Sequence, residues 1–186
     1  MMMTALEERG ALLHGHFRLS SGRHSPQFIQ KFRILELPAM VERVAKEIVA
    51  KFPHALHPTV VLSAAVGGII LGYEVARQLG VRAIFVEKEG GAPTLRRGFE
   101  LDSGDRALVV EDVITTGGSV REVLDVARNH HAAVVGVGAI VRREPVDFGV
   151  PTVALLDVRI PSFAPEDCPQ CKAGEPITEP GSRFLR

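Results

Sequence analysis

Residues 109–120 read VVEDVITTGGSV, and two adjacent carboxylates, Glu111 and Asp112, interrupt the apolar start of this stretch. A turn rich in hydroxyl groups and glycine follows, from Thr115 to Ser119. Backbone N–H groups and hydroxyls at the start of a helix bind phosphate well. The neighbouring carboxylates repel phosphate but can hold sugar hydroxyls or a divalent cation. The stretch therefore predicts a ligand with a phosphate at one end and a hydroxylated or metal-bridged group nearby, as in a sugar phosphate.

An ordinary turn or helix N-cap would explain the threonines, glycines and serine of this stretch equally well. The acidic pair favours the binding site, because two carboxylates at a strand end repel each other unless a cation or hydrogen-bond donors share them.

A second loop of small residues, Ala64-Ala65-Val66-Gly67-Gly68, follows the apolar stretch 59–62. Small residues let the backbone approach an anion, although tight packing of helix on strand would explain them as well. Two such loops on separate strands would suit a ligand with two anionic ends. A Walker A motif and a GxGxxG motif are both absent from the chain, which argues against nucleotide triphosphate hydrolysis and nicotinamide chemistry.

Basic residues that could contact an anionic ligand occur at two further places in the sequence. The loop predicted over residues 87–98 carries Lys88, Arg96 and Arg97, which could close over a leaving phosphate or form a solvated hairpin tip. Arg142 and Arg143 follow an apolar strand, where arginine can grip a carboxylate or simply lie on the surface.

The seven histidines show no ligand spacing, so we expect them on the surface or in loops. The cysteines, Cys168 and Cys171, form one CPQC motif, which supplies half of a zinc tetrahedron. We expect them to be reduced and structural. The alternative is a zinc ion whose other ligands come from elsewhere in the chain or from a partner chain.

Hydrophobic periodicity predicts the elements that must position these residues. Strands are expected near residue 28 and over 59–62, 81–86, 107–110, 134–141 and 152–156. Helices are expected over 4–13, from 38 onward, over 68–79 and over 119–129. This alternation predicts an α/β fold with a mainly parallel, twisted sheet covered by helices on both faces. Ligands bind such sheets at the carboxyl ends of the strands, where the acidic pair lies.

The chain of 186 residues suits a single domain, with a small N-terminal hood element over residues 1–37 and an irregular proline-rich tail over 161–186. The net charge is zero, so nothing in the composition calls for nucleic acid. The first ten residues lack the apolar region of a signal peptide, and the longest apolar stretch is too short to span a bilayer. We therefore expect a cytoplasmic protein that binds no membrane.

VVEDVITTGGSV resembles the phosphoribosyl pyrophosphate (PRPP) signature of the type I phosphoribosyltransferases. Within that superfamily, LSSGRHSPQF near the N-terminus and EKEGG with LRRGFEL resemble the orotate phosphoribosyltransferases. The CPQC tail resembles that of a subgroup of short bacterial and archaeal members.

The resemblance implies transfer of the phosphoribosyl group from PRPP to orotate with Mg²⁺, in a homodimer whose mobile loop crosses into the neighbouring site. It implies that Asp112 and Lys88 are catalytic and that Thr115, Arg143 and Phe28 contact orotate. Mg²⁺ would be held mainly by PRPP, with help from Glu111 and Asp112. The implied PRPP-binding residues are Lys88, Ala64, Ala65, Val66, Gly67, Gly68, Glu111, Asp112, Val113, Ile114, Thr115, Thr116, Gly117, Gly118 and Ser119.

The chain departs from the family pattern at several positions. Ser20 stands where the family often has lysine, and Glu87 replaces a loop arginine. Arg96 and Arg97 are the candidates to replace the loop's later cations. Three rival functions remain: a purine or xanthine phosphoribosyltransferase, which shares the signature; a PRPP-sensing regulator of nucleotide synthesis; and a non-catalytic subunit resembling PRPP synthetase, which would usually be longer.

Overall fold

The computed structural model describes residues 10–19 and 21–180, and they fall into two compact units. Unit 1 takes its residues from the two ends of the chain, 1–34 and 159–186, and unit 2 comprises residues 35–158. The N-terminal segment and the proline-rich tail thus belong together. Within the described residues, no helix combines the length and apolar character needed to cross a bilayer.

Unit 1 is built on an antiparallel hairpin of β1 (Leu12–Arg18) and β2 (His24–Ile29), which contains the strand expected near residue 28. The predicted helix over residues 4–13 is wrong at Leu12 and Leu13, which begin β1, and its residues 4–9 lie outside the described part. The tail is irregular, as predicted, apart from the single turns η2 (Pro165–Asp167) and α6 (Pro169–Lys172). Isolated bridges join it to the hairpin at Phe17 with Thr178 and at His24 with Phe163.

Unit 2 contains a six-stranded sheet in the order β5-β4-β3-β6-β7-β8. Every neighbouring pair is parallel except β4 with β5. The strands are β3 (Val60–Ala64), β4 (Arg82–Glu89), β5 (Ala92–Leu95), β6 (Arg106–Ile114), β7 (Ala133–Arg142) and β8 (Thr152–Asp157). The predicted mainly parallel α/β sheet is therefore confirmed.

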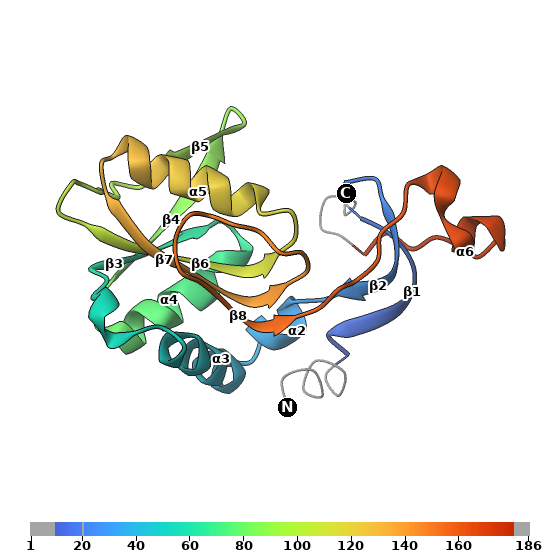
Figure 1. Ribbon diagram of the computed structural model, residues 1–186, viewed down its shortest axis with the longest axis horizontal. Coiled ribbons are helices and arrows are strands. Elements are labelled where there is room, and N and C mark those ends of the chain that lie inside the picture. Colours follow the sequence, from blue (N-terminus) through green and yellow to red (C-terminus); the bar gives the residue numbers. More distant parts are fainter. Residues whose placement is uncertain (1–9, 20, 181–186) are drawn as a thin grey trace. The chain divides into compact units, whose positions relative to one another are not determined.

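Helices cover both faces of this sheet (Figure 1), with α3 and α4 on one face and α5 on the other. They are α3 (Pro38–Ala50), α4 (Gly67–Leu79) and α5 (Gly118–Asn129), with α2 (Phe32–Leu35) and η1 (His54–Leu56) as short additions. Pro38 opens α3, and Gly80, with φ +69°, ends α4 in the left-handed conformation. The three predicted long helices are thus confirmed.

The central strand β6 is buried on both faces, which explains the four consecutive apolar residues that precede its acidic pair, Ala107 to Val110. Toward α5, Val109 belongs to a core that includes Val123 and Leu124. On the α3 side the sheet needs glycine: a Cβ atom on Gly138 would lie 2.8 Å from Ile48 Cγ2. Gly136 and Gly138 therefore serve close helix packing, in agreement with their exclusion as a dinucleotide motif.

Two sequence predictions need correction in this sheet. The polar loop predicted over residues 87–98 is largely a hairpin, because β4 continues to Glu89 and β5 returns antiparallel from Ala92. Gly90 and Gly91, both with positive φ, form its turn. The acidic pair does not follow β6 but lies within it, because β6 continues to Ile114.

Candidate active site

Glu111 and Asp112 lie at the carboxyl end of β6, where the strand loses one neighbour. Pairing with β3 ends at Val110, whereas pairing with β7 continues to Ile114. Both carboxylates are buried and fold back on the strand: Asp112 N–H donates to Glu111 Oε1 at 2.9 Å, and Val113 N–H donates to Asp112 Oδ1 at 2.6 Å. These bonds hold the acidic side chains in place beside the loop that follows.

The loop after β6 turns at Gly117, which has φ +81° and precedes the first residue of α5. A Cβ atom on Gly117 would lie 2.9 Å from Phe148 Cζ, so both conformation and space require glycine there. Thr115, Thr116 and Ser119 are exposed, and no side chain caps the start of α5. The loop therefore presents hydroxyls and uncapped helix N–H groups, the arrangement that suits a phosphate.

Val113 and Ile114 are also predicted to bind PRPP, but they belong to the strand and not to the loop that follows it. They end β6, and the Ile114 side chain is buried in the core. A ligand at this edge would therefore meet the backbone of Ile114 and not its side chain.

The second predicted loop, residues 64–68, connects β3, the strand next to β6, to α4. Ala65 and Val66 are exposed, and the peptide bond between them is cis. A Cβ atom on Gly68 would lie 3.1 Å from Ser63 Cβ and 3.5 Å from Glu111 Oε1. Gly68 thus lets the start of α4 lie directly against the acidic pair, so the two predicted anion loops are neighbours.

The three predicted cations of the β4–β5 hairpin lie on β4 (Lys88) or directly after β5 (Arg96 and Arg97), and each is paired with a glutamate. Lys88 Nζ lies 2.8 Å from Glu122 Oε1 on α5. Arg97 forms two hydrogen bonds with Glu87, at 2.7 and 2.8 Å, which hold the pKa of that carboxyl below its ordinary value. Arg96 pairs with Glu89 at 3.3 Å. Lys88 is the cation of this hairpin that reaches toward α5.

A small pocket of about 50 Å³ brings several predicted residues together. Ala64 and Ala65 from the β3 loop, Lys88 from β4 and Ser119 from α5 all line it. Glu122, Val123, Pro93, Val86 and Glu87 complete the lining. The pocket thus brings residues of both loops and of the basic hairpin together at the carboxyl ends of the strands, while the binding of PRPP there stays a prediction.

Among the lining residues that the sequence analysis did not predict, Glu122 is the charged one that pairs with the predicted cation Lys88. The spacing along the sequence could have pointed to Glu122, because it follows Ser119 by three residues and so lies one helical turn further along α5. Its pairing with Lys88 is a tertiary contact that no local pattern announces.

Arg142 and Arg143 have different environments, although they are adjacent at the end of β7. Arg142 Nε donates to Asp157 Oδ1 at 2.6 Å, which pairs it with β8 and raises its pKa. Arg143 N–H donates to Ile114 O at 2.8 Å, so its backbone joins the strand of the acidic pair. Burial lowers the pKa of Arg143, against the opposing charge of Glu144. Both arginines are partly buried, and Arg143 is the one whose backbone is bonded to the strand of the acidic pair.

One of the predicted contacts with orotate lies in unit 1. Phe28 belongs to β2 of unit 1, where its ring centroid lies 5.9 Å from that of Phe17. Ser20 lies outside the described residues. The role of Phe28 stays a prediction.

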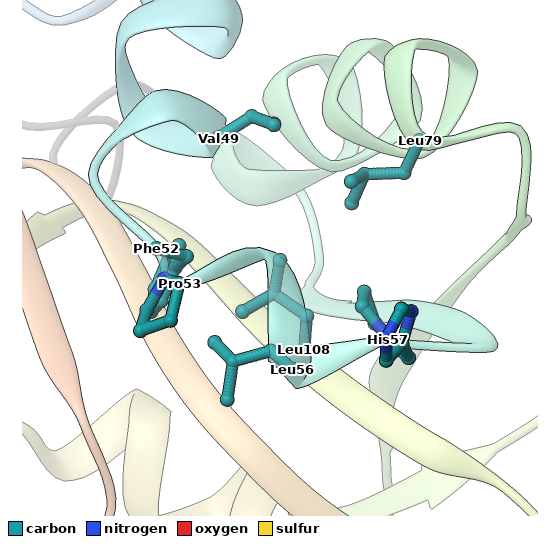
Figure 2. A pocket seen from close by; sticks show the side chains of 8 residues that line it. Val49, Phe52, Pro53, Leu56, His57, Leu79 and Leu108 are labelled. Atoms are coloured by element: carbon teal, nitrogen blue, oxygen red, sulfur yellow. The ribbon is translucent and has the colours of Figure 1, made fainter.

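A larger pocket of about 220 Å³ lies near the amino ends of the strands, opposite the end that carries the acidic pair (Figure 2). Its lining is mostly apolar and comes from the end of α3, the segment before β3, the end of α4 and Leu108 of β6. His57 is the polar exception, and acidic residues and glycine loops are absent from the lining. Because ligands of parallel sheets bind at the carboxyl ends of strands, the smaller pocket is the better candidate.

Comparison with known proteins agrees with this geometry. A family model described as "Phosphoribosyl transferase domain" matches residues 33–146. The orotate phosphoribosyltransferase of Pelotomaculum thermopropionicum is 50% identical over 186 residues, covering 99% of this chain and 97% of that protein. That of Thermotoga maritima is 47% identical over 188 residues, covering 100% of both.

Solved structures show the same likeness. The crystal structure of orotate phosphoribosyltransferase from Aeropyrum pernix has a TM-score of 0.74 at 26% identity, covering 86% of this chain and 94% of that chain. The likeness to the type I phosphoribosyltransferases expected from the sequence is thus confirmed. The chain belongs to the phosphoribosyltransferase family, and the two curated relatives named above, which it matches over nearly their full length, are orotate phosphoribosyltransferases.

Proposed function

We propose that this phosphoribosyltransferase transfers the 5-phosphoribosyl group of PRPP to orotate, giving orotidine 5′-monophosphate and pyrophosphate in pyrimidine biosynthesis. A ring nitrogen of orotate forms the new bond to C1 of the ribose, and the bond from C1 to the pyrophosphate oxygen breaks. The observation that carries this proposal is the 50% identity, over almost the whole chain, to a protein named orotate phosphoribosyltransferase.

Different residues of the site would bind different parts of PRPP. Thr115–Ser119 would bind the 5-phosphate through hydroxyls and the uncapped start of α5. Glu111 and Asp112 would hold the ribose hydroxyls, and the loop 64–68 would bind the pyrophosphate. Lys88 would stabilise the leaving pyrophosphate, as its place in the small pocket beside Ala64 and Ala65 supports. Positioning and charge stabilisation thus supply most of the catalysis.

Mg²⁺ is the proposed cofactor. The fixed carboxylates of Glu111 and Asp112 offer the hard oxygen donors that Mg²⁺ prefers, so the residues present fit it. When bound with PRPP, Mg²⁺ would neutralise charge on the departing pyrophosphate. The chain's own contribution is to orient the ribose hydroxyls beside the metal.

Orotate differs from uracil by one carboxylate, which calls for a cation at the base site. Arg143 is the proposed partner, because its backbone is bonded to Ile114, on the strand of the acidic pair, and its guanidinium is partly buried there. A guanidinium can hold a carboxylate through two parallel hydrogen bonds.

A homodimer and a cytoplasmic location are further proposals, drawn from the family resemblance and the sequence. In a shared site, the β4–β5 hairpin would carry Lys88 to the neighbouring subunit. The exposure of the Lys88 side chain, 57%, is compatible with such a reach.

The test of the main proposal is incubation with PRPP, Mg²⁺ and a panel of bases, following the loss of orotate absorbance and the release of pyrophosphate. We expect pyrophosphate release with orotate and none with adenine, guanine, xanthine or uracil. Release with a purine alone would establish the rival phosphoribosyltransferase. PRPP binding without release from any base would favour the regulator.

A further inference from the structure

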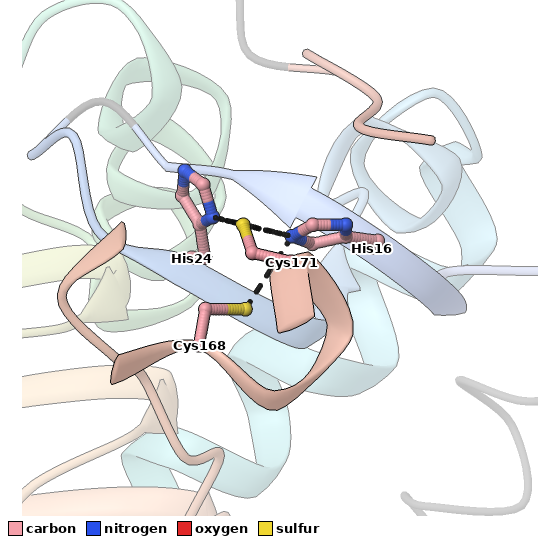
Figure 3. A group of neighbouring side chains, drawn as sticks. All are labelled: His16, His24, Cys168 and Cys171. Atoms are coloured by element: carbon pink, nitrogen blue, oxygen red, sulfur yellow. Dashed lines mark hydrogen bonds between the residues drawn. The ribbon is translucent and has the colours of Figure 1, made fainter. Parts of the chain in front are cut away.

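Four side chains with metal-binding atoms converge in unit 1 (Figure 3). His16 comes from β1, His24 from β2, and Cys168 and Cys171 from the CPQC motif of the tail. One donor atom from each lies within 4.8 Å of all the others. The cysteines follow His16 by more than 150 positions, so only the fold brings the group together.

Four of the six distances between these donor atoms are close to those of a metal tetrahedron. His16 Nε2 lies 3.2 Å from His24 Nδ1, 3.4 Å from Cys168 Sγ and 3.6 Å from Cys171 Sγ. His24 Nδ1 lies 3.1 Å from Cys171 Sγ. Zinc with ordinary bond lengths and tetrahedral angles would separate two nitrogens by about 3.3 Å and a nitrogen from a sulfur by about 3.6 Å. A zinc ion would therefore fit with shifts of only a few tenths of an ångström.

The cluster is shielded from water and its histidines are oriented for binding. Cys168, His16 and His24 are buried, with at most 4% of each exposed, so the expectation that all histidines lie on the surface or in loops is wrong for these two. His16 Nδ1 lies 2.9 Å from Glu175 O, and only a protonated Nδ1 can donate there. That tautomer leaves the lone pair of Nε2 directed at the cluster, as in many zinc sites.

Backbone hydrogen bonds hold the tail against the hairpin on both sides of the cluster. His24 and Phe163 exchange two bonds, at 2.9 and 2.8 Å. Thr178 N–H donates to His16 O at 2.8 Å, and Arg18 N–H donates to Thr178 O at 2.9 Å. The donor atoms are thus placed by the chain itself.

We propose that His16, His24, Cys168 and Cys171 bind one Zn²⁺ as a closed structural site that fastens the tail to the β1–β2 hairpin. Two thiolates and two imidazoles suit zinc and exclude the hard cation Mg²⁺. Four protein ligands leave no open position for a substrate, so the metal is structural. The site is complete within one chain and does not depend on the proposed function.

Metal analysis tests the proposal directly. Protein purified without added metal, and the same protein stripped and dialysed against Zn²⁺ with excess Mg²⁺, should hold one zinc ion per chain. Cys171→Ser and His24→Ala should each lower that zinc content severalfold. His14→Ala should retain it, because His14 is an exposed histidine on β1, the strand that carries His16. Absence of stoichiometric zinc from both wild-type preparations would overturn the proposal, and so would full retention in Cys171→Ser.

Two further measurements separate metal loss from misfolding. His24→Cys preserves a ligand and should retain zinc where His24→Ala does not. Co²⁺ in the wild-type site should show the intense visible bands and thiolate charge transfer of a tetrahedral centre. A Co²⁺ spectrum without thiolate charge transfer would exclude the cysteines as ligands and reject the site.

Discussion

Lys88 Nζ on β4 lies 2.8 Å from Glu122 Oε1 on α5, which joins the basic hairpin to the helix that follows the turn at Gly117. Both side chains are more than a third exposed, and such ion pairs contribute only about 0–1 kcal/mol. Lys88 can therefore exchange Glu122 for an anionic ligand at little cost.

Replacing Lys88 by alanine tests its role. A charge-assisted hydrogen bond contributes about 1.5–3 kcal/mol, so Lys88→Ala should lower kcat/KM for PRPP at least tenfold without changing the melting temperature much. Arg128→Ala is the matched control, because Arg128 is an exposed cation paired with Asp125 at 3.2 Å on the same helix. Equal activity in the two variants would remove Lys88 from the mechanism.

The acidic pair is tested at Asp112. Asp112→Asn should preserve the fold, because the amide oxygen can still accept the Val113 N–H bond. Turnover should fall at least tenfold through weaker binding of ribose hydroxyls and Mg²⁺, measured by steady-state kinetics with circular dichroism as the check on folding. Asp125→Asn, on the exposed side of α5, should stay at wild-type activity. If Asp112→Asn stays within about threefold of wild type, Asp112 has no catalytic role.

Mixing two inactive variants tests a shared site. If Lys88 acts on the pyrophosphate of the neighbouring subunit, a mixture of Lys88→Ala and Asp112→Asn should regain activity, because hybrid dimers contain one intact site. Subunit exchange is first established by mass spectrometry with one variant isotopically labelled. No recovery after exchange would mean that Lys88 serves the pocket of its own chain.

The two arginines at the end of β7 offer a matched pair. Arg143→Ala should lower kcat/KM for orotate at least tenfold while the KM for PRPP changes much less, since the phosphate loops are intact. Arg142→Ala removes the bond to Asp157 and should affect stability more than orotate specificity. An equal loss of PRPP and orotate affinity in Arg143→Ala would contradict our placement of the base.

Asp105 gives a pH-dependent prediction for stability. Burial raises its pKa, but hydrogen bonds from Arg82, Asp102 N–H and Thr59 outweigh this, so the folded pKa lies below the ordinary value. A lowered folded pKa stabilises the protein above the unfolded pKa of about 3.9, and this contribution is lost as pH falls through the folded value.

Asp105→Asn should therefore cost about 1–3 kcal/mol of unfolding free energy at pH 7, and the difference from wild type should shrink below about pH 4. Denaturant titrations of both proteins at several pH values measure this difference in unfolding free energy. Activity per folded molecule should be unchanged, because Asp105 precedes β6, at its amino end. A constant difference across the pH range would show that the carboxylate charge is not the cause.

The sequence by itself determined most of the sheet and helices of unit 2 and the composition of its site. Strand and helix periods are local signals, so β6, α5 and the residues between them are readable from VVEDVITTGGSV. The order of acidic pair, glycine turn and helix encodes the phosphate loop, because its conformation depends on residues a few positions apart.

Only the tertiary structure decided the features that depend on distant partners. The residues of β5 become a strand because β4 offers them a hydrogen-bonding edge, and the residues of β1 because β2 does. Arg142 and Arg143 look equivalent in sequence, but Arg142 bonds to Asp157 on β8 whereas the Arg143 backbone bonds to Ile114 on β6. His16 and His24 look like loop histidines until the tail brings Cys168 and Cys171 against them, since metal ligands need proximity in space and not along the chain.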